Sequence, residues 1–207
     1  MSGLLPDEEQ LRANVYALLG RLLASPPDES LRQSLGEAGS SSAAGDPDMD
    51  AAWQLLATSA ERADPMSLAD EYQDLFIGLG RGEVVPYASW YLTGFLMELP
   101  LAQLRGDLRA LGIERQEGVR EPEDHAAALC DTMALLITAD PPVSLQRQQQ
   151  FFSRHIEPWL ARFFGDLQQA RSARFYRAVG ILGERFLAIE SEAFRISVPA
   201  AGAAKPS

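Results

Sequence analysis

Apolar residues recur along most of the chain at the three- and four-residue spacing that places them on one face of a helix. The pattern is clearest in residues 11–23, where the apolar stripe ends just before Pro26 and Pro27. No alternating pattern typical of a β-strand runs for a convincing length. The sequence therefore predicts an all-α fold, a helical bundle of roughly eight or more helices. Further helices are expected over residues 28–38, 51–62, 67–77, 90–111, 123–138, 145–164 and 174–189.

Proline and small polar residues divide this pattern. Pro100 and Pro158 lie inside two of the expected helices, the first of which should kink or split and the second of which should be interrupted. Residues 39–47 are small and polar, which predicts a flexible connection, and residues 199–207 are expected to form a disordered tail. Because the length of 207 residues suits one domain, residues 1–198 are predicted to form a single all-α domain.

The charge of the chain is acidic. It has 18 Lys and Arg against 29 Asp and Glu, a formal net charge of −11, and its only lysine is Lys205. General nucleic-acid binders neutralise phosphates with clustered basic residues, so that class is excluded and no nucleic-acid partner is expected. An acidic surface favours the attraction of basic partners.

The single cysteine and the first ten residues indicate the cellular compartment in which the protein is expected. Cys130 has no partner for an internal disulfide and falls on an apolar helix face, where it is expected to pack as a small hydrophobe. Residues 1–10 are acidic and lack the apolar run of a secretory leader, and no stretch is apolar enough to span a membrane. The sequence predicts a cytoplasmic protein without stable membrane insertion.

A glycine-rich loop leads into a cluster of aromatic residues. The loop over residues 78–82 comes after a helix, whereas a phosphate-binding loop comes after a strand, so a glycine cap with a flexible turn is the favoured interpretation. If a helix begins at Pro86, then Tyr87, Trp90 and Tyr91 share one face of it. That face is either buried core or the wall of a surface groove.

The segment over residues 121–125 (EPEDH) combines acidic residues with a histidine. Pro122 fits the first position of a helix, and carboxylates are favoured in a first turn. Asp124 and His125 leave open an acid–base pair, and hence a small hydrolase or lyase, although adjacent helical side chains do not orient one another. Since His155 is the only other histidine and no nucleophile lies in a recognisable motif, we predict no catalytic residue, metal or cofactor.

Several short motifs succeed one another along these predicted helices. They are Glu71-Tyr72-x-x-Leu75-Phe76-x-Gly78, Pro86-Tyr87-x-Ser89-x-Tyr91, Glu121-Pro122-x-Asp124-His125 and Phe151-Phe152-x-x-His155-Ile156-x-Pro158-Trp159. In this order they resemble the TorD/DmsD/NarJ family of cytoplasmic chaperones for molybdenum-containing respiratory oxidoreductases, over roughly residues 11–189. The intact Glu-Pro-x-Asp-His stretch favours the TorD and DmsD branches over NarJ.

The resemblance implies an all-α binding protein without turnover. Family members hold the apo catalytic subunit of a molybdopterin oxidoreductase until its cofactor is inserted, and many bind its twin-arginine signal peptide, which prevents premature export. A structural adaptor subunit of a respiratory complex is the other non-enzymatic alternative. The sequence does not decide the client, whether the protein is a monomer or a dimer, or whether a nucleotide binds.

The resemblance also implies a binding site. Asp124 and His125 match the pair implicated in signal-peptide recognition, and an apolar wall is expected beside them. Carboxylates are the natural partners of two guanidinium groups, and an apolar groove suits the helix that comes after them in the leader. The expected client-binding residues are Leu75, Phe76, Pro86, Tyr87, Trp90, Glu121, Glu123, Asp124 and His125.

Overall fold

The computed structural model describes residues 6–38, 46–115, 118, 121–141 and 143–197. Within these ranges every regular element is a helix, so the all-α prediction is confirmed. The expected tail and most of the expected connection over residues 39–47 lie outside the described residues. Among the described helices, none has both the length and the hydropathy that crossing a membrane requires.

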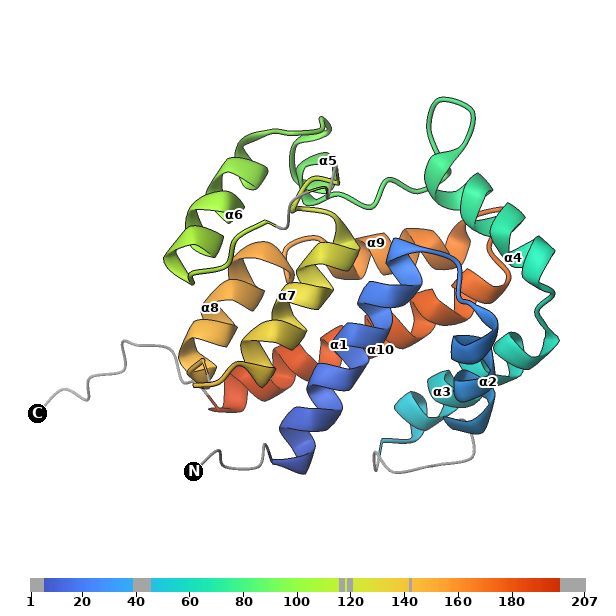
Figure 1. Ribbon diagram of the computed structural model, residues 1–207, viewed down its shortest axis with the longest axis horizontal. Coiled ribbons are helices and arrows are strands. Elements are labelled where there is room, and N and C mark those ends of the chain that lie inside the picture. The colour runs from blue at the N-terminus through green and yellow to red at the C-terminus, as the bar shows by residue number, and fades with distance from the viewer. Residues whose placement is uncertain (1–5, 39–45, 116–117, 119–120, 142, 198–207) are drawn as a thin grey trace, which may run out of the picture.

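The helices keep the expected order along the chain (Figure 1). They are α1 (Asp7–Ala24), α2 (Glu29–Ala38), α3 (Pro47–Arg62), α4 (Pro65–Tyr72), the π-helical turn η1 (Gln73–Ile77), α5 (Ala88–Thr93), α6 (Leu99–Ala110), α7 (Ala126–Thr138), α8 (Leu145–His155), α9 (Leu160–Gln169) and α10 (Phe175–Ser197).

Two long helices organise the packing. In Figure 1, α1 and α10 run through the middle, α2, α3 and α4 gather at one end, and α6, α7 and α8 gather at the other. α1 packs against α7, and α10 packs against α9 and α3. The hydrophobic core of the bundle contains fully buried aromatic side chains, among them Tyr16, Trp159 and Tyr176. Cys130 is also fully buried, as predicted, and burial raises the pKa of its thiol.

The helix expected over residues 90–111 is two helices, α5 and α6. The break falls at Gly94, whose left-handed backbone (φ +83°) ends α5, and not at Pro100, which lies in the first turn of α6. Proline is tolerated there because its missing N–H would have no partner in the helix. By contrast, the interruption expected at Pro158 is found, since α8 ends at His155 and α9 begins at Leu160.

Two helix starts also differ from the prediction. α7 begins at Ala126, so Pro122 and the carboxylates after it lie in the turn before the helix and not in its first turn. α3 begins at Pro47, and the carboxylate of Asp46 accepts hydrogen bonds of 3.0 Å from the N–H groups of Asp48 and Met49. The end of the expected connection is therefore a capped helix start.

Candidate functional site

The start of α5 and the start of α7 are joined by backbone hydrogen bonds. Ala88 N–H donates to the carbonyl of Asp124 (3.0 Å), and Ala126 N–H donates to the carbonyl of Pro86 (2.8 Å). Tyr87 and His125 face each other in the resulting isolated antiparallel bridge. The structure thus brings the second and third sequence motifs together in one junction.

The side chain of Asp124 belongs to this junction. It is 1% exposed, and its Oδ2 accepts a hydrogen bond of 2.9 Å from Ser89 N–H in the first turn of α5. Tyr87, at the N-cap position of α5, supplies no side-chain cap of its own. Asp124 therefore caps α5 from a distance of 35 positions in the sequence.

The neighbouring side chain caps a different helix. Nδ1 of His125 accepts a hydrogen bond of 3.1 Å from Ala127 N–H, which makes His125 the N-cap of α7. This bond assigns the proton of the neutral ring to Nε2. The ring lies edge-on to that of Tyr87, with centroids 5.1 Å apart. Because Asp124 and His125 bond to different helices, they do not form the acid–base pair that the sequence left open.

Burial of His125 predicts a pH-dependent stability. Burial lowers its pKa from 6.5 to about 4, so below pH 6.5 the unfolded chain takes up a proton that the folded chain does not. The free energy of unfolding should therefore rise with pH between pH 4 and 6.5, and between pH 7 and pH 5 His125 should account for a loss of about 2 kcal/mol. Urea unfolding of His125→Asn, which keeps a capping side chain, should show a correspondingly smaller loss.

Leu135→Ser is the control, because Leu135 is exposed on α7 and its replacement leaves both histidines in place, so this variant should decline as the wild type does. If His125→Asn declined as steeply as the wild type over this pH range, the assignment of the neutral, capping His125 would be wrong.

The carboxylates beside this pair differ in exposure. Glu121 is exposed and accepts a hydrogen bond from the hydroxyl of Tyr87. Glu123 is half-buried and accepts hydrogen bonds from Nε (3.0 Å) and Nη2 (2.8 Å) of Arg105. Burial alone would raise the pKa of Glu123, but the hydrogen bonds from Arg105, a backbone hydrogen bond and the positive charges of Arg105 and Arg115 together outweigh it, and the pKa is lowered. Of the two, Glu121 is the more accessible to a basic ligand.

The apolar residues that were expected to form the wall of a client-binding groove differ in how deeply they are buried. Leu75 is fully buried and Pro86 is buried. Phe76 is half-buried and packs against Tyr72 and Tyr176, with ring centroids 4.9 and 5.2 Å away. The structure places these residues in the packing beneath the surface.

The aromatic residues around α5 do not share the single face expected of a helix that begins at Pro86. Tyr87 precedes the helix and faces His125. Trp90 is half-buried beneath the guanidinium of Arg81, 4.8 Å from its ring centroid. Tyr91 packs on the ring of Trp159 (5.4 Å) and donates a hydrogen bond to Asp166. The expectation fails because α5 begins two residues later.

The structure shows an apolar surface that the sequence did not single out. Five large side chains between the last turn of α5 and the start of α6 are between 42% and 72% exposed, and we refer to them as the 92–99 surface. They are Leu92, Phe95, Leu96, Met97 and Leu99. Met97 has a positive φ (59°), which is rare for a residue other than glycine and marks local backbone strain. Gly94 within a leucine-rich segment was the available sequence signal.

A small cavity is lined by residues of this surface and by Pro122 of the Glu-Pro-x-Asp-His segment. It has a volume of about 200 Å³, and the residues that line it include Met97, Glu98, Arg115 and Pro122. Glu98 is exposed, and its carboxylate has no hydrogen-bond or ion-pair partner among the described residues. Exposed apolar groups and one unpaired carboxylate, that of Glu98, therefore lie next to the Glu-Pro-x-Asp-His segment.

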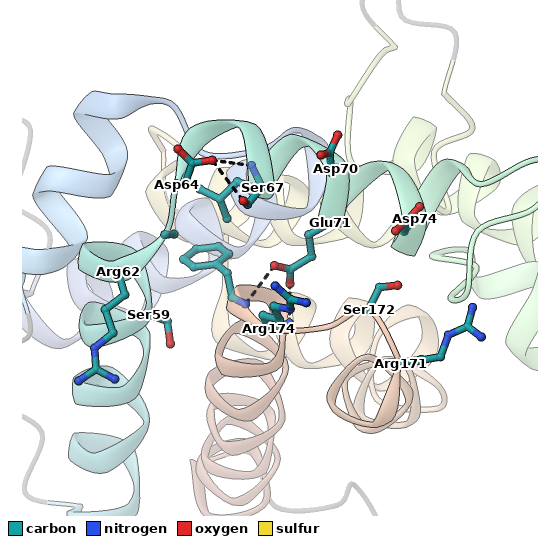
Figure 2. Close-up of a pocket in the computed structure, with 13 residues that line it drawn as sticks. Ser59, Arg62, Asp64, Ser67, Asp70, Glu71, Asp74, Arg171, Ser172 and Arg174 are labelled. Atoms are coloured by element: carbon teal, nitrogen blue, oxygen red, sulfur yellow. Dashed lines mark hydrogen bonds between the residues drawn. The ribbon is translucent and has the colours of Figure 1, made fainter.

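The first sequence motif belongs to another helix junction (Figure 2). Glu71 is 8% exposed and points from α4 at the first turn of α10. Its carboxylate accepts hydrogen bonds from the N–H groups of Arg174 (2.8 Å), Phe175 (3.2 Å) and Tyr176 (2.8 Å). The neighbouring Tyr72 hydroxyl bonds to carbonyls at the end of α1. This motif joins three helices.

A cavity of about 580 Å³ opens beside Glu71, between α4 and the turn before α10. Its basic side chains do not converge, since Arg62 and Arg171 lie on opposite sides of it in Figure 2. No cluster of three or more metal-ligating side chains occurs in the described part of the chain. The polar groups of this cavity thus offer no focused site for an anion or a metal.

The glycine-rich loop over residues 78–82 has a backbone role. The chain that follows the loop folds back onto η1, where Glu83 N–H and Val84 N–H donate hydrogen bonds to backbone carbonyls. A Cβ on Gly82 would lie 2.3 Å from the carbonyl oxygen of Leu75. Glycine is required there because the two backbone segments approach so closely.

Comparison with known proteins identifies the family. The family described as nitrate reductase delta subunit matches residues 42–165. The chain belongs to this family, which is that of the NarJ/TorD chaperones and is not a family of enzymes. The resemblance inferred from the motifs is confirmed.

Within the family, similar relatives are named chaperone protein TorD. That of Shewanella loihica is 30% identical over 200 residues, which cover 89% of this chain and 93% of the relative. That of Vibrio cholerae serotype O1 is 33% identical over 131 residues, 59% of this chain and 60% of the relative. The chain thus spans about three fifths of the length of the Vibrio cholerae relative that it matches.

A solved structure shows the same fold. The crystal structure of a protein from Archaeoglobus fulgidus, described as belonging to redox enzyme maturation, aligns with 91% of this chain and 99% of its own. The TM-score is 0.54 and the sequence identity is 18%.

Proposed function

We propose that this protein is a cytoplasmic chaperone that binds the apo catalytic subunit of a molybdopterin oxidoreductase, together with its twin-arginine signal peptide. Binding would hold the subunit for cofactor insertion and prevent premature export. The TorD relatives support the chaperone role. The observation that carries the binding role is the 92–99 surface beside the Glu-Pro-x-Asp-His segment.

The chemistry of this region fits a twin-arginine leader. Clustered exposed apolar side chains are typical of interaction sites, and those of the 92–99 surface suit the apolar helix of a leader. Glu98 and Glu121 are exposed carboxylates that suit guanidinium groups. The net charge of −11 favours encounter with a basic peptide.

The nine expected site residues divide by accessibility under this proposal. Tyr87, Trp90, Glu121 and Glu123 are accessible enough to touch the client, whereas Leu75, Pro86 and Asp124 are buried and act by shaping the surface. His125 is buried as well, against the ring of Tyr87, and Phe76 is half-buried between the rings of Tyr72 and Tyr176.

Binding should depend on the exposed apolar side chains. Phe95→Ser and Met97→Ser should each weaken the affinity for a leader by about tenfold or more, because each removes apolar area that the bound leader would cover. Thermal unfolding should change little, since both side chains are mostly exposed. Calorimetric titration with a synthetic twin-arginine leader from a molybdopterin oxidoreductase of the same organism measures the effect.

Leu135→Ser is the matched control, because Leu135 is 50% exposed on α7, outside the 92–99 surface. An equal loss of affinity in Leu135→Ser, or no loss in either test variant, would remove the 92–99 surface from the proposal.

A further inference from the structure

We propose that Asp124 is a positioning residue, which holds α5 and the 92–99 surface in place, and that its carboxylate does not contact the arginines of a leader. This inference rests on the function proposed above and assigns a role within it. It differs from the direct role that the resemblance implied for Asp124.

The carboxylate of Asp124 is closed to a ligand at the surface. The residue is 1% exposed, and one of its oxygens is bonded to Ser89 N–H inside the protein. Ser89 is itself fully buried. A guanidinium group would reach this carboxylate only if the junction between α5 and α7 opened. Glu98 and Glu121 offer carboxylates at the surface nearby without such opening.

The start of α5 is held by Asp124. α5 has only six residues, and a helix of that length is not stable by itself. Its first two N–H groups, those of Ala88 and Ser89, both bond to Asp124, one to the carbonyl and one to Oδ2. The direction in which α5 leaves the junction is therefore set by this residue, together with the packing of Tyr91 on Trp159.

The 92–99 surface is continuous with α5. The helix ends at Gly94, and the surface begins in its last turn and extends to the start of α6. α5 also packs against α6. A shift at the start of α5 is thus transmitted over a few residues to all five exposed apolar side chains. His125 fixes the other half of the junction by capping α7.

The two possible roles of Asp124 make opposite predictions for a substitution that removes the charge and keeps the shape. Asp124→Asn retains an oxygen that accepts from Ser89 N–H, whereas Asp124→Ala retains none. Nδ2 of the asparagine would take the place of Oδ1, which has no hydrogen-bond partner among the described residues. If Asp124 positions α5, the asparagine variant should bind nearly as the wild type does. If Asp124 contacts an arginine, both variants should bind weakly.

The experiment titrates the full chain and its variants with the synthetic twin-arginine leader and measures amide hydrogen exchange of residues 88–93 without the leader. We expect Asp124→Asn to bind within about threefold of the wild type and Asp124→Ala to bind at least about tenfold more weakly. Exchange in residues 88–93 should accelerate in Asp124→Ala and stay near the wild-type rate in Asp124→Asn. Glu98→Gln removes an exposed carboxylate that the proposed function assigns to a guanidinium group, so it should weaken binding and leave the exchange of residues 88–93 near the wild-type rate.

An equal loss of affinity in Asp124→Asn and Asp124→Ala would overturn the positioning role, as would wild-type affinity in Asp124→Ala. If Asp124→Ala does not fold, Asp124→Asn decides alone, since strong loss of binding by the folded asparagine variant assigns a direct ionic role. If the wild type itself does not bind the leader, the proposed function fails, while the exchange rates still show whether Asp124 holds α5.

Discussion

Replacement of Glu71 by alanine is expected to lower the free energy of unfolding by about 3 kcal/mol. The carboxylate of Glu71 is buried and accepts hydrogen bonds from three consecutive N–H groups at the start of α10. Alanine would leave those donors without a protein partner, and the N–H groups of Phe175 and Tyr176 are buried. Urea unfolding at pH 7, monitored by circular dichroism, measures the change.

Glu71→Gln is the matched control, because glutamine keeps an accepting oxygen at the same position. It should lose clearly less stability than the alanine variant. A loss below about 1 kcal/mol in Glu71→Ala would show that the cap of α10 is not a major source of stability.

Replacement of Arg12 by alanine is expected to lower the free energy of unfolding by about 3–5 kcal/mol. Arg12 on α1 makes a two-pronged contact with Glu190 on α10, with Nε–Oε1 and Nη2–Oε2 distances of 2.8 and 2.9 Å. Glu190 is 1% exposed and also accepts a hydrogen bond of 3.0 Å from the Tyr16 hydroxyl. Without Arg12 a carboxylate remains buried with one hydroxyl as its partner. Urea unfolding at pH 7 measures this loss.

Arg195→Ala provides the comparison, because Arg195 forms an exposed ion pair with Glu192 on the same helix. Exposed pairs contribute little, so this variant should unfold close to the wild type. Similar losses in Arg12→Ala and Arg195→Ala would contradict the special role of the buried contact between α1 and α10.

Most of the helices could be predicted from the sequence because their apolar spacing is a local property. The break at Gly94 was missed because Leu92, Phe95, Leu96 and Leu99 keep helical spacing across it. Spacing alone does not show whether such residues are covered by another element, so the exposure of the 92–99 surface could not be predicted. It depends on where α5 and α6 lie relative to the rest of the chain.

The charged residues of the motifs illustrate the same limit. Glu71, Asp124 and His125 could be selected from the sequence, but each caps a helix in the folded protein. The helices capped by Glu71 and Asp124 lie 105 and 35 positions away from them in the sequence. Which helix a side chain caps at such a distance depends on tertiary packing, and it cannot be inferred from the local sequence pattern.

Titration of the purified protein with the catalytic subunit of a molybdopterin oxidoreductase from the same organism tests the proposed chaperone function most directly. The subunit is prepared in two forms, one free of cofactor with its twin-arginine leader attached, and one loaded with cofactor and without the leader. We predict specific binding of the first form and no detectable binding of the second. Equal binding of both forms would indicate a permanent adaptor subunit, and binding of neither form would contradict the chaperone function.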